Sequence, residues 1–474
     1  MPRFYQTAGA KGRAMEMPPV PEKLKPLHSA INAALTSGAA RSFALAAGAV
    51  VVLAAALNAA VILKASYTEI DWVAYMQEVE QYLQGERDYS KMNPCEPWHP
   101  LVYPAGFVYS FAALHELTGW KSASADPCTQ RDRSDPAAMR MAQWIFAAMH
   151  VTTLGLVAAV YAKASRSSPR ARDWRAPNLP AACLLLLLCS KRVLSIFVLR
   201  MFNDCAAMCL FFAAVLLLVQ RRWKISCACY SLAVSIKMNI LLTAPALLLI
   251  LVLEHGALGA VAHIAICAAV QLGLAWPFLS THPEQYLRGA FDVSRQFTHK
   301  WSVNFKWLPP ELFSSNRFAI FCLIMHLCVL WQFVNRCWCG KHGGLLATLR
   351  KVGWRGHRGS VSEYDMCLWL FTANLAGMVF ARSLHFQFYV WYFFTLPFLL
   401  WSCGDALPLA TKLLIFGAIE ACWNPWDKVE GTSTKHSSLL LCGMHFMLLL
   451  GVYHAPQSKL RFADSAVEDK AKKA

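Results

Sequence analysis

The chain has 474 residues, of which 57% are hydrophobic and 15% are charged, and its formal net charge is +17. Soluble domains are about 45–50% apolar and about a quarter charged, so this composition excludes an ordinary soluble domain. The basic residues fall in short loops between apolar runs, as in the segment 163–172. This distribution orients a membrane protein and does not indicate nucleic-acid binding. We expect one all-α, multi-pass membrane protein with lipid as a partner and no nucleic acid.

Residues 1–41 are polar, basic and proline-rich, and they lack the cleavage pattern of a secretory signal. They predict a flexible cytosolic tail. The run Phe43–Leu63 has no charged residue and is long enough to cross the hydrocarbon core. We expect it to act as an uncleaved signal anchor that places the following residues in the lumen.

The segment 64–138 is predicted to form a large first lumenal loop, because its first part is acidic and poor in Lys and Arg. The apolar run Leu101–Leu117 lies within this segment. Counting it as a span would place the basic loop 163–175 in the lumen, against the distribution of positive charge. The run is also short and contains Pro104, so we expect a re-entrant or surface helix.

The later apolar runs predict further spans, about twelve in total with the first, within a membrane domain at 42–454. They leave 280–316 as a second large lumenal loop and 455–474 as a cytosolic tail, with both termini cytosolic. The expected spans are 141–162, 179–198, 202–219, 225–236, 240–253, 258–279, 317–334, 363–381, 387–403, 408–422 and 438–454.

Most of the 17 cysteines lie in apolar runs, where a thiol behaves as a small hydrophobe. Cys337 and Cys339 with His342 hint at a metal site, but a second pair at ligand spacing is missing, and no metal is expected. Cys95 and Cys128 both fall in the loop assigned to the oxidising lumen, so they are a candidate disulfide.

The last five residues place Lys472 and Lys470 third and fifth from the end of the chain. This is the pattern of a dilysine retrieval signal, which would be recognised by coat-type retrieval machinery. Such a signal works only in the cytosol, in agreement with the predicted topology. An incidental basic tail is the alternative.

An amphipathic helix is predicted just after the first span. Its apolar residues recur at helical spacing, and acidic and amide side chains occupy much of the rest of its circumference. The apolar residues are Trp72, Tyr75, Met76, Val79 and Leu83, and the polar ones are Glu78, Glu80 and Gln81.

Glu69 and Asp71 lie at the start of this helix, where the chain is predicted to leave the membrane. A carboxylate in this position can take a proton from a hydroxyl group beside a lipid-bound donor. A structural role is the alternative, because Ser66 and Glu69 have the spacing of a capping box. Acidic residues in a first turn also favour the helix dipole.

Four other places carry polar groups in apolar or aromatic surroundings. Lys191-Arg192 and Lys237-Met-Asn239 either serve a binding function at membrane depth or reach the surface from helix ends. Aromatic residues alternate with polar ones at 297–313, which suits a sugar and a phosphate or an interfacial belt. Arg382 can grip a phosphate with its planar fork or anchor the interface.

Seven segments then support a resemblance. In chain order they are Tyr67–Trp72, Leu101–Phe107, Arg140–Gln143, Leu199–Asp204, Ser235–Asn239, Trp301–Pro309 and Arg382–Trp391. Together they resemble the dolichyl-phosphate-mannose-dependent α-1,3-mannosyltransferases of N-glycan precursor assembly, over about residues 42 to 454. The segments 91–99 and 120–136 depart from that family's pattern.

The resemblance implies a GT-C fold and an inverting transfer of mannose to the five-mannose dolichyl-diphosphate oligosaccharide, at the lumenal side of the endoplasmic reticulum. It implies Asp71 as the general base and no cofactor or metal. Arg382 and His385 would hold the donor phosphate, and Trp301 with Asn304 would shape the pocket. The full set of implied substrate-binding residues is Glu69, Tyr103, Arg200, Asn203, Asp204, Lys237, Asn239, Lys300, Trp301, Asn304, Arg382, His385 and Gln387.

Two other functions remain open. One is a different dolichyl-phosphate-sugar transferase, for example one that acts on glycolipid anchors. The other is a polyprenyl-lipid transporter, which would be expected to show two related halves.

Overall fold

The computed structural model describes residues 40–92, 101–120, 136–167, 179–292, 298–357 and 359–455. Within these ranges the fold is helical, without a strand and with one isolated bridge between Asp427 and Thr432. The tail 1–39, the cysteines Cys95 and Cys128 and the C-terminal lysine pattern lie outside the described residues.

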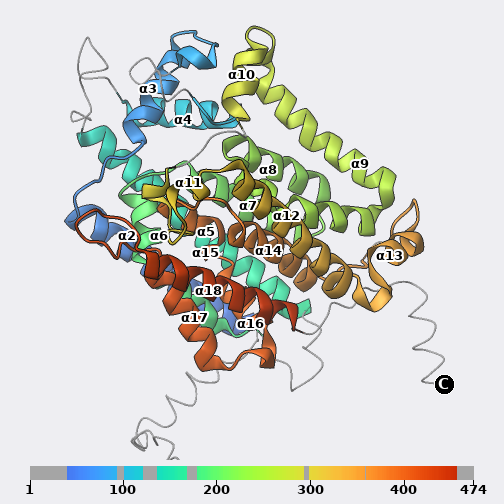
Figure 1. Cartoon of the computed structure of the whole chain (residues 1–474). Helices are drawn as coiled ribbons and strands as arrows, with labels where there is room; N and C mark the ends of the chain where they lie inside the picture. The colour runs from blue at the N-terminus through green and yellow to red at the C-terminus, as the bar shows by residue number, and fades with distance from the viewer. Residues whose placement is uncertain are drawn as a thin grey trace, which may run out of the picture.

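The helices follow one another along the whole chain (Figure 1). The longer ones are α2 (Ala40–Lys64), α3 (Trp72–Leu83), α4 (Ala105–Thr118), α5 (Pro136–Ser167), α6 (Lys191–Val198), α7 (Asp204–Val219), α8 (Trp223–Ile236), α9 (Ala244–Leu279), α10 (Pro283–Ala290), α12 (Asn316–Gln332), α13 (Gly344–Val352), α14 (Glu363–Val379), α17 (Leu409–Cys422) and α18 (Lys435–Tyr453). Short helices α11 (Pro310–Phe313), α15 (Val390–Phe393) and α16 (Leu396–Ser402) join them.

Helix α14 is the centre of the core. Every residue from Asp365 to Val379 is buried, and α14 packs against α5, α9, α12 and α18. A helix that is apolar on all sides is stable only when other elements surround it. On one side, α5 also packs against α2 and α7, and α7 packs against α8.

Helices α3, α4 and α10 lie together across one end of this bundle, at the top of Figure 1. The apolar side of α3 packs on α4, and Trp72, Tyr75, Met76 and Val79 are buried there as expected. Two residues differ from the predicted pattern: Leu83 is 42% exposed, whereas Glu78 is buried. Glu78 is buried because neighbouring elements cover more of α3 than its apolar side, whereas Leu83 is the last residue of the helix.

Among the described residues, five helices are long and apolar enough to cross a membrane, or six if one bent pair counts as a single span. They are Arg41–Lys64, Pro136–Ser167, Met238–Leu279, Asn316–Trp338 and Lys435–Tyr453, and the bent pair is Ala181–Leu188 with Lys191–Val198. Helix α4 has 14 residues and is not among them, and the non-spanning position of Leu101–Leu117 stays a prediction.

Several expected spans are not continuous helices. The segment 179–198 bends by 62° between its two halves. The segment 387–403 is divided among a 3-10 turn, α15 and α16. The expected spans 240–253 and 258–279 lie mostly in α9, which consists of two helices joined at a kink at Gly256, where φ is +71°. A side chain there would meet the backbone of Trp354 and Arg355, so glycine permits the close approach.

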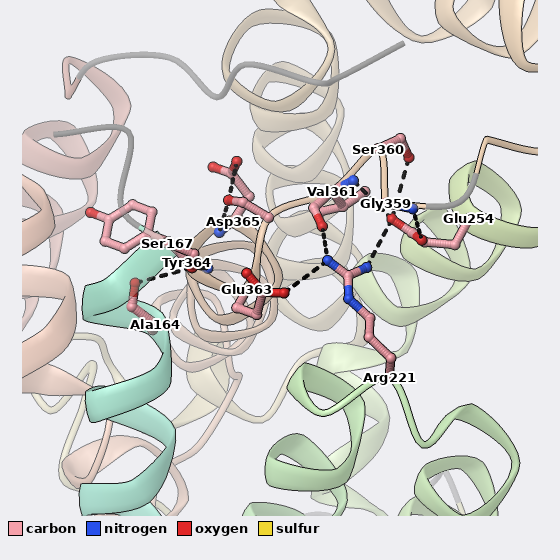
Figure 2. Close-up of polar contacts among 11 residues, drawn as sticks. Ala164, Ser167, Arg221, Glu254, Gly359, Ser360, Val361, Glu363, Tyr364 and Asp365 are labelled. Atoms are coloured by element: carbon pink, nitrogen blue, oxygen red, sulfur yellow. Dashed lines mark hydrogen bonds and ion pairs between the residues drawn. The ribbon is translucent and has the colours of Figure 1, made fainter. Parts of the chain in front are cut away.

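A cluster of polar side chains connects the C-terminal end of α7 with the beginning of α14 (Figure 2). Arg221 donates to the Val361 carbonyl at 2.6 Å and pairs with Glu363 and Glu254, each at 3.1 Å. Glu254 also accepts hydrogen bonds from the backbone N–H of Gly359 and Val361. Since α7 has 16 residues, this cluster lies about 24 Å along the helix from Asp204.

Candidate functional site

The loop 65–71 joins α2 to α3 and carries both predicted acidic residues. The backbone N–H of Thr68 donates to the Leu199 carbonyl at 3.1 Å, so the loop is held against the turn that follows α6. Helix α3 begins at Trp72 with Asp71 at its N-cap position, and the Asp71 side chain makes no capping hydrogen bond. The predicted capping box of Ser66 and Glu69 is therefore wrong, because the helix starts several residues later than that pattern requires.

The carboxylate of Glu69 accepts hydrogen bonds from two residues close to it in the chain. Tyr67 donates its hydroxyl to Oε2, and the backbone N–H of Val73 donates to Oε1 at 3.2 Å. Burial raises the pKa of Glu69, and these two hydrogen bonds oppose that shift. Both oxygens of Glu69 thus stabilise the entry into α3.

Asp71 is linked to a buried polar chain through Tyr75, one turn further along α3. The Tyr75 hydroxyl donates to Asp71 Oδ2 at 3.1 Å. The Tyr75 hydroxyl oxygen also lies 3.5 Å from the Tyr103 hydroxyl and 3.4 Å from Asn203 Oδ1. Tyr75 is 2% exposed and Asn203 is fully buried, so these contacts are shielded from water.

Lys237 and Asp204 continue the chain of polar contacts. Lys237 Nζ donates to Asn203 Oδ1 at 2.9 Å and to Asp204 Oδ2 at 2.6 Å. The indole N–H of Trp391 donates to the other oxygen of Asp204. Asp204 is fully buried and Lys237 is 8% exposed. Lys237 therefore does not reach the surface by snorkelling; it neutralises Asp204 inside the bundle.

Asn239, two residues after Lys237 along the chain, behaves differently. It is half-buried, and its amide lies 3.7 Å from the sulfur of Met208. Of the two residues singled out in the motif 235–239, Lys237 thus belongs to the polar chain, whereas Asn239 lies beside it.

A second set of contacts fixes the segment that carries Arg382 and His385. Asn304 donates to the Ala381 carbonyl at 2.7 Å and accepts from the backbone N–H of Leu384 at 2.8 Å. Ser302 donates to Asn304 Oδ1 at 2.9 Å. The polar atoms of Asn304 are thus used within the protein, where they brace the turn 381–384.

The remaining predicted residues of this region are less buried. Lys300 pairs with Glu430 at 2.9 Å and lies over the ring of Trp301, which is 46% exposed. Arg382, His385 and Gln387 are half-buried. The His385 ring lies 5.5 Å from that of Phe388, which stacks on Trp391 at 3.8 Å.

The structure thus brings most of the predicted residues into two connected groups. One group is a chain of contacts formed by Asp71, Tyr103, Asn203, Asp204 and Lys237. In the other group, Asn304 braces the segment that carries Arg382 and His385. Trp391 and the stacked Phe388 join the two.

Sequence reasoning did not assign a site role to Tyr75, Trp391 or Ser302. Tyr75 was placed on the apolar face, although its spacing of four residues from Asp71 indicates a shared face of a helix. Trp391 lies 187 residues from Asp204 along the chain, so no local signal could have paired them. Within the described ranges, no three His, Cys, Asp or Glu side chains come together as a metal site.

These observations define an all-helical membrane protein with a buried polar cluster beside an acidic loop. The model of the family described as ALG3 protein matches residues 48–438. The chain belongs to this family.

Named relatives agree with this assignment. The chain is 39% identical over 402 residues to the Dol-P-Man:Man(5)GlcNAc(2)-PP-Dol alpha-1,3-mannosyltransferase of Arabidopsis thaliana, covering 82% of this chain and 83% of the relative. It is 40% identical over 397 residues to the human protein of the same name, with 83% of each chain covered. The corresponding mouse protein is 39% identical over 398 residues, again with 83% of each chain covered.

Proposed function

We propose that this protein is a mannosyltransferase that transfers mannose from dolichyl-phosphate-mannose, in α-1,3 linkage, to the five-mannose dolichyl-diphosphate oligosaccharide of the N-glycosylation pathway. Family membership and the relatives' names support the donor, the acceptor and the linkage. The observation that carries the chemistry is the placement of Asp71 at the start of α3, beside a buried chain of polar groups.

Asp71 is the proposed general base. Transfer of the sugar requires that the acceptor hydroxyl loses its proton as the bond between mannose and phosphate breaks, and an ionised carboxylate can accept that proton. Glu69 is less suited to this role, because both of its oxygens accept hydrogen bonds, one from Tyr67 in its loop and one from Val73 in the first turn of α3. Inversion at the anomeric carbon follows from a single displacement with Asp71 as the base.

The topology is part of the same proposal. We place the loop 65–71 on the lumenal side of the endoplasmic reticulum membrane, in a GT-C fold of about twelve spans with both termini in the cytosol. The apolar helices and the excess of basic residues in the loops 163–175 and 336–358 support this orientation. The reaction is proposed to need no metal or other cofactor, and the C-terminal lysine pattern is proposed to return the protein to this membrane.

Purified protein incubated with dolichyl-phosphate-mannose and the five-mannose acceptor tests the proposal. The expected product carries six mannoses. Asp71→Asn should lower turnover at least about a hundredfold, the low end for general acid–base catalysis. The variant should fold, since asparagine also suits the start of a helix. Glu69→Gln should retain much more activity.

The outcomes separate the alternatives. If Asp71→Asn keeps near-normal turnover while Glu69→Gln is inactive, Glu69 is the base. If wild-type protein transfers a different sugar from dolichyl phosphate, the proposed donor is wrong. Transport of the lipid without transfer would exclude the enzyme altogether.

A further inference from the structure

Two arginines beside the acidic loop lack a close carboxylate. Arg192 on α6 is 9% exposed, and Arg200 is half-buried in the turn that follows α6. Their guanidinium groups are near enough to interact electrostatically. Two buried or half-buried cations that repel each other are unfavourable unless an anion compensates them.

The described residues supply only part of that compensation. Arg192 uses Nε to donate to the Trp423 carbonyl at 2.9 Å, and its guanidinium lies 4.6 Å from the centre of the Phe386 ring. Arg200 donates through Nη1 to the Ser195 hydroxyl. Among the described residues, none places a carboxylate oxygen within 4.0 Å of either guanidinium; Glu420 interacts with Arg192 only at longer range.

The contrast with the other cations of the interior is informative. Arg221 is held by two carboxylates and a carbonyl (Figure 2), and Lys237 is held by Asp204. Each of these two cations, one half-buried and the other buried, has an opposite charge within 3.1 Å. For Arg192, the two terminal amino groups of the fork have no acceptor among the described residues.

The position of the pair connects it to the proposed reaction. The hydrogen bond from Thr68 to Leu199 holds the turn of Arg200 against the loop that carries Asp71. Phe386, which covers Arg192, directly follows His385. Helix α6 is the second half of the 62° bent pair, a geometry typical of a broken span or a re-entrant loop. Charged residues in such segments are usually functional.

We infer that Arg192 and Arg200 bind the phosphate of a polyprenyl-phosphate substrate. The planar fork of arginine matches phosphate oxygens through paired hydrogen bonds. This inference rests on the proposed function, in which two substrates bring phosphate: a monophosphate on the donor and a diphosphate on the acceptor. We assign Arg382 and His385 to one of them and the pair on α6 to the other.

Steady-state kinetics with each substrate varied in turn test the assignment. Arg192→Lys and Arg200→Lys keep the charge and lose the fork. Each should raise KM at least about tenfold for one substrate, with little change in kcat. A raised KM for the donor assigns the pair to the monophosphate, and a raised KM for the acceptor assigns it to the diphosphate. Unchanged KM values for both substrates would overturn the inference.

Arg288→Lys is the matched control, because Arg288 is 81% exposed and, among the described residues, forms its ion pair with Glu284 on its own helix. Its KM values should equal those of the wild type. A merely structural role of Arg200 is tested by Ser195→Ala, which removes the hydroxyl that Arg200 contacts and should leave both KM values near normal.

A binding experiment keeps the inference separate from the proposed reaction. Dolichyl phosphate and dolichyl diphosphate should each raise the melting temperature of the wild-type protein more than dolichol does. For one of these two lipids, the difference should disappear in Arg192→Gln and Arg200→Gln. If the Gln variants lose this difference but wild-type protein transfers no mannose, the proposed function fails and the phosphate site stands. If the Gln variants keep the difference for both lipids, the phosphate site fails.

Discussion

Tyr75 donates a hydrogen bond to Asp71 across the first turn of α3, with 3.1 Å between its hydroxyl oxygen and Oδ2. The tyrosine is buried and also lies within 3.5 Å of Tyr103 and Asn203. It therefore connects the proposed base with the polar interior. A donor in this position orients the carboxylate and favours its ionised form.

Tyr75→Phe should lower kcat about tenfold with KM nearly unchanged. A hydrogen bond to a charged group contributes about 1.5–3 kcal/mol, which makes a loss of this size reasonable. Because the lost donor favoured the ionised carboxylate, the low-pH limb of the kcat profile should move to higher pH. Initial rates between pH 5 and 8 measure both effects.

Tyr82→Phe is the control for that variant. Tyr82 lies on the same helix, half-buried, against Tyr109 and the cation of Arg87. Its replacement should change neither kcat nor the profile. A normal profile in Tyr75→Phe would show that Tyr75 only fills space.

Lys237→Met should reduce the free energy of unfolding by about 3–5 kcal/mol, the usual loss when one partner of a buried ion pair is removed. Asp204 would then stay buried without its cation. The double variant Lys237→Met with Asp204→Asn removes both charges and should recover part of the loss. Thermal unfolding in detergent measures the three variants.

The exposed pair of Lys300 and Glu430 provides the comparison for stability. Lys300→Met should cost at most about 1 kcal/mol, because solvent screens exposed pairs. Equal destabilisation by both lysine replacements would contradict the role assigned to the buried pair.

Glu69→Gln tests the electrostatics of the acidic loop. Burial raises the pKa of Glu69 above its ordinary value of 4.5. A raised carboxyl pKa means that the contribution of this group to stability is full below pH 4.5 and is lost as the pH rises through the folded-state pKa. Glutamine does not titrate. As the pH rises from 4.5, the melting temperature of the variant should therefore increase relative to that of the wild type.

The opposite sign is expected for Glu86→Gln. The backbone N–H of Asp88 is the main cause of the lowered pKa of Glu86, which is half-buried. Its contribution to stability is present above pH 4.5 and is lost at lower pH. The melting temperature of this variant should therefore decrease relative to that of the wild type as the pH rises. If the difference in melting temperature between Glu69→Gln and the wild type does not change with pH, burial does not raise the pKa of Glu69.

Arg382→Lys keeps a positive charge and loses the planar fork. KM for dolichyl-phosphate-mannose should rise severalfold, while the melting temperature stays near normal. Arg317→Lys, an exposed arginine on α12, is the control and should leave the donor KM unchanged. Unchanged donor kinetics in Arg382→Lys would make Arg382 an interfacial anchor.

The sequence was sufficient for the helical class, the membrane character and the family. Apolar runs without charges, such as Phe43–Leu63, form helices wherever lipid or other helices cover them, because the backbone must satisfy its hydrogen bonds internally. The periodicity of Trp72 to Val79 likewise predicted the buried face of α3. The order of seven short motifs indicated the family, which the comparisons confirm.

Only the tertiary structure decided how the buried charges are matched. Periodicity shows which face of one helix is apolar, but it carries no information on which residues of distant segments meet. Asp204 therefore finds Lys237 and Trp391, 33 and 187 residues away, and Asn304 braces a turn 77 residues further on. The exact start of α3 was also beyond the local pattern. Ser66 and Glu69 have the spacing of a cap, yet the loop is not helical before Trp72, and Thr68 within it donates a hydrogen bond to Leu199.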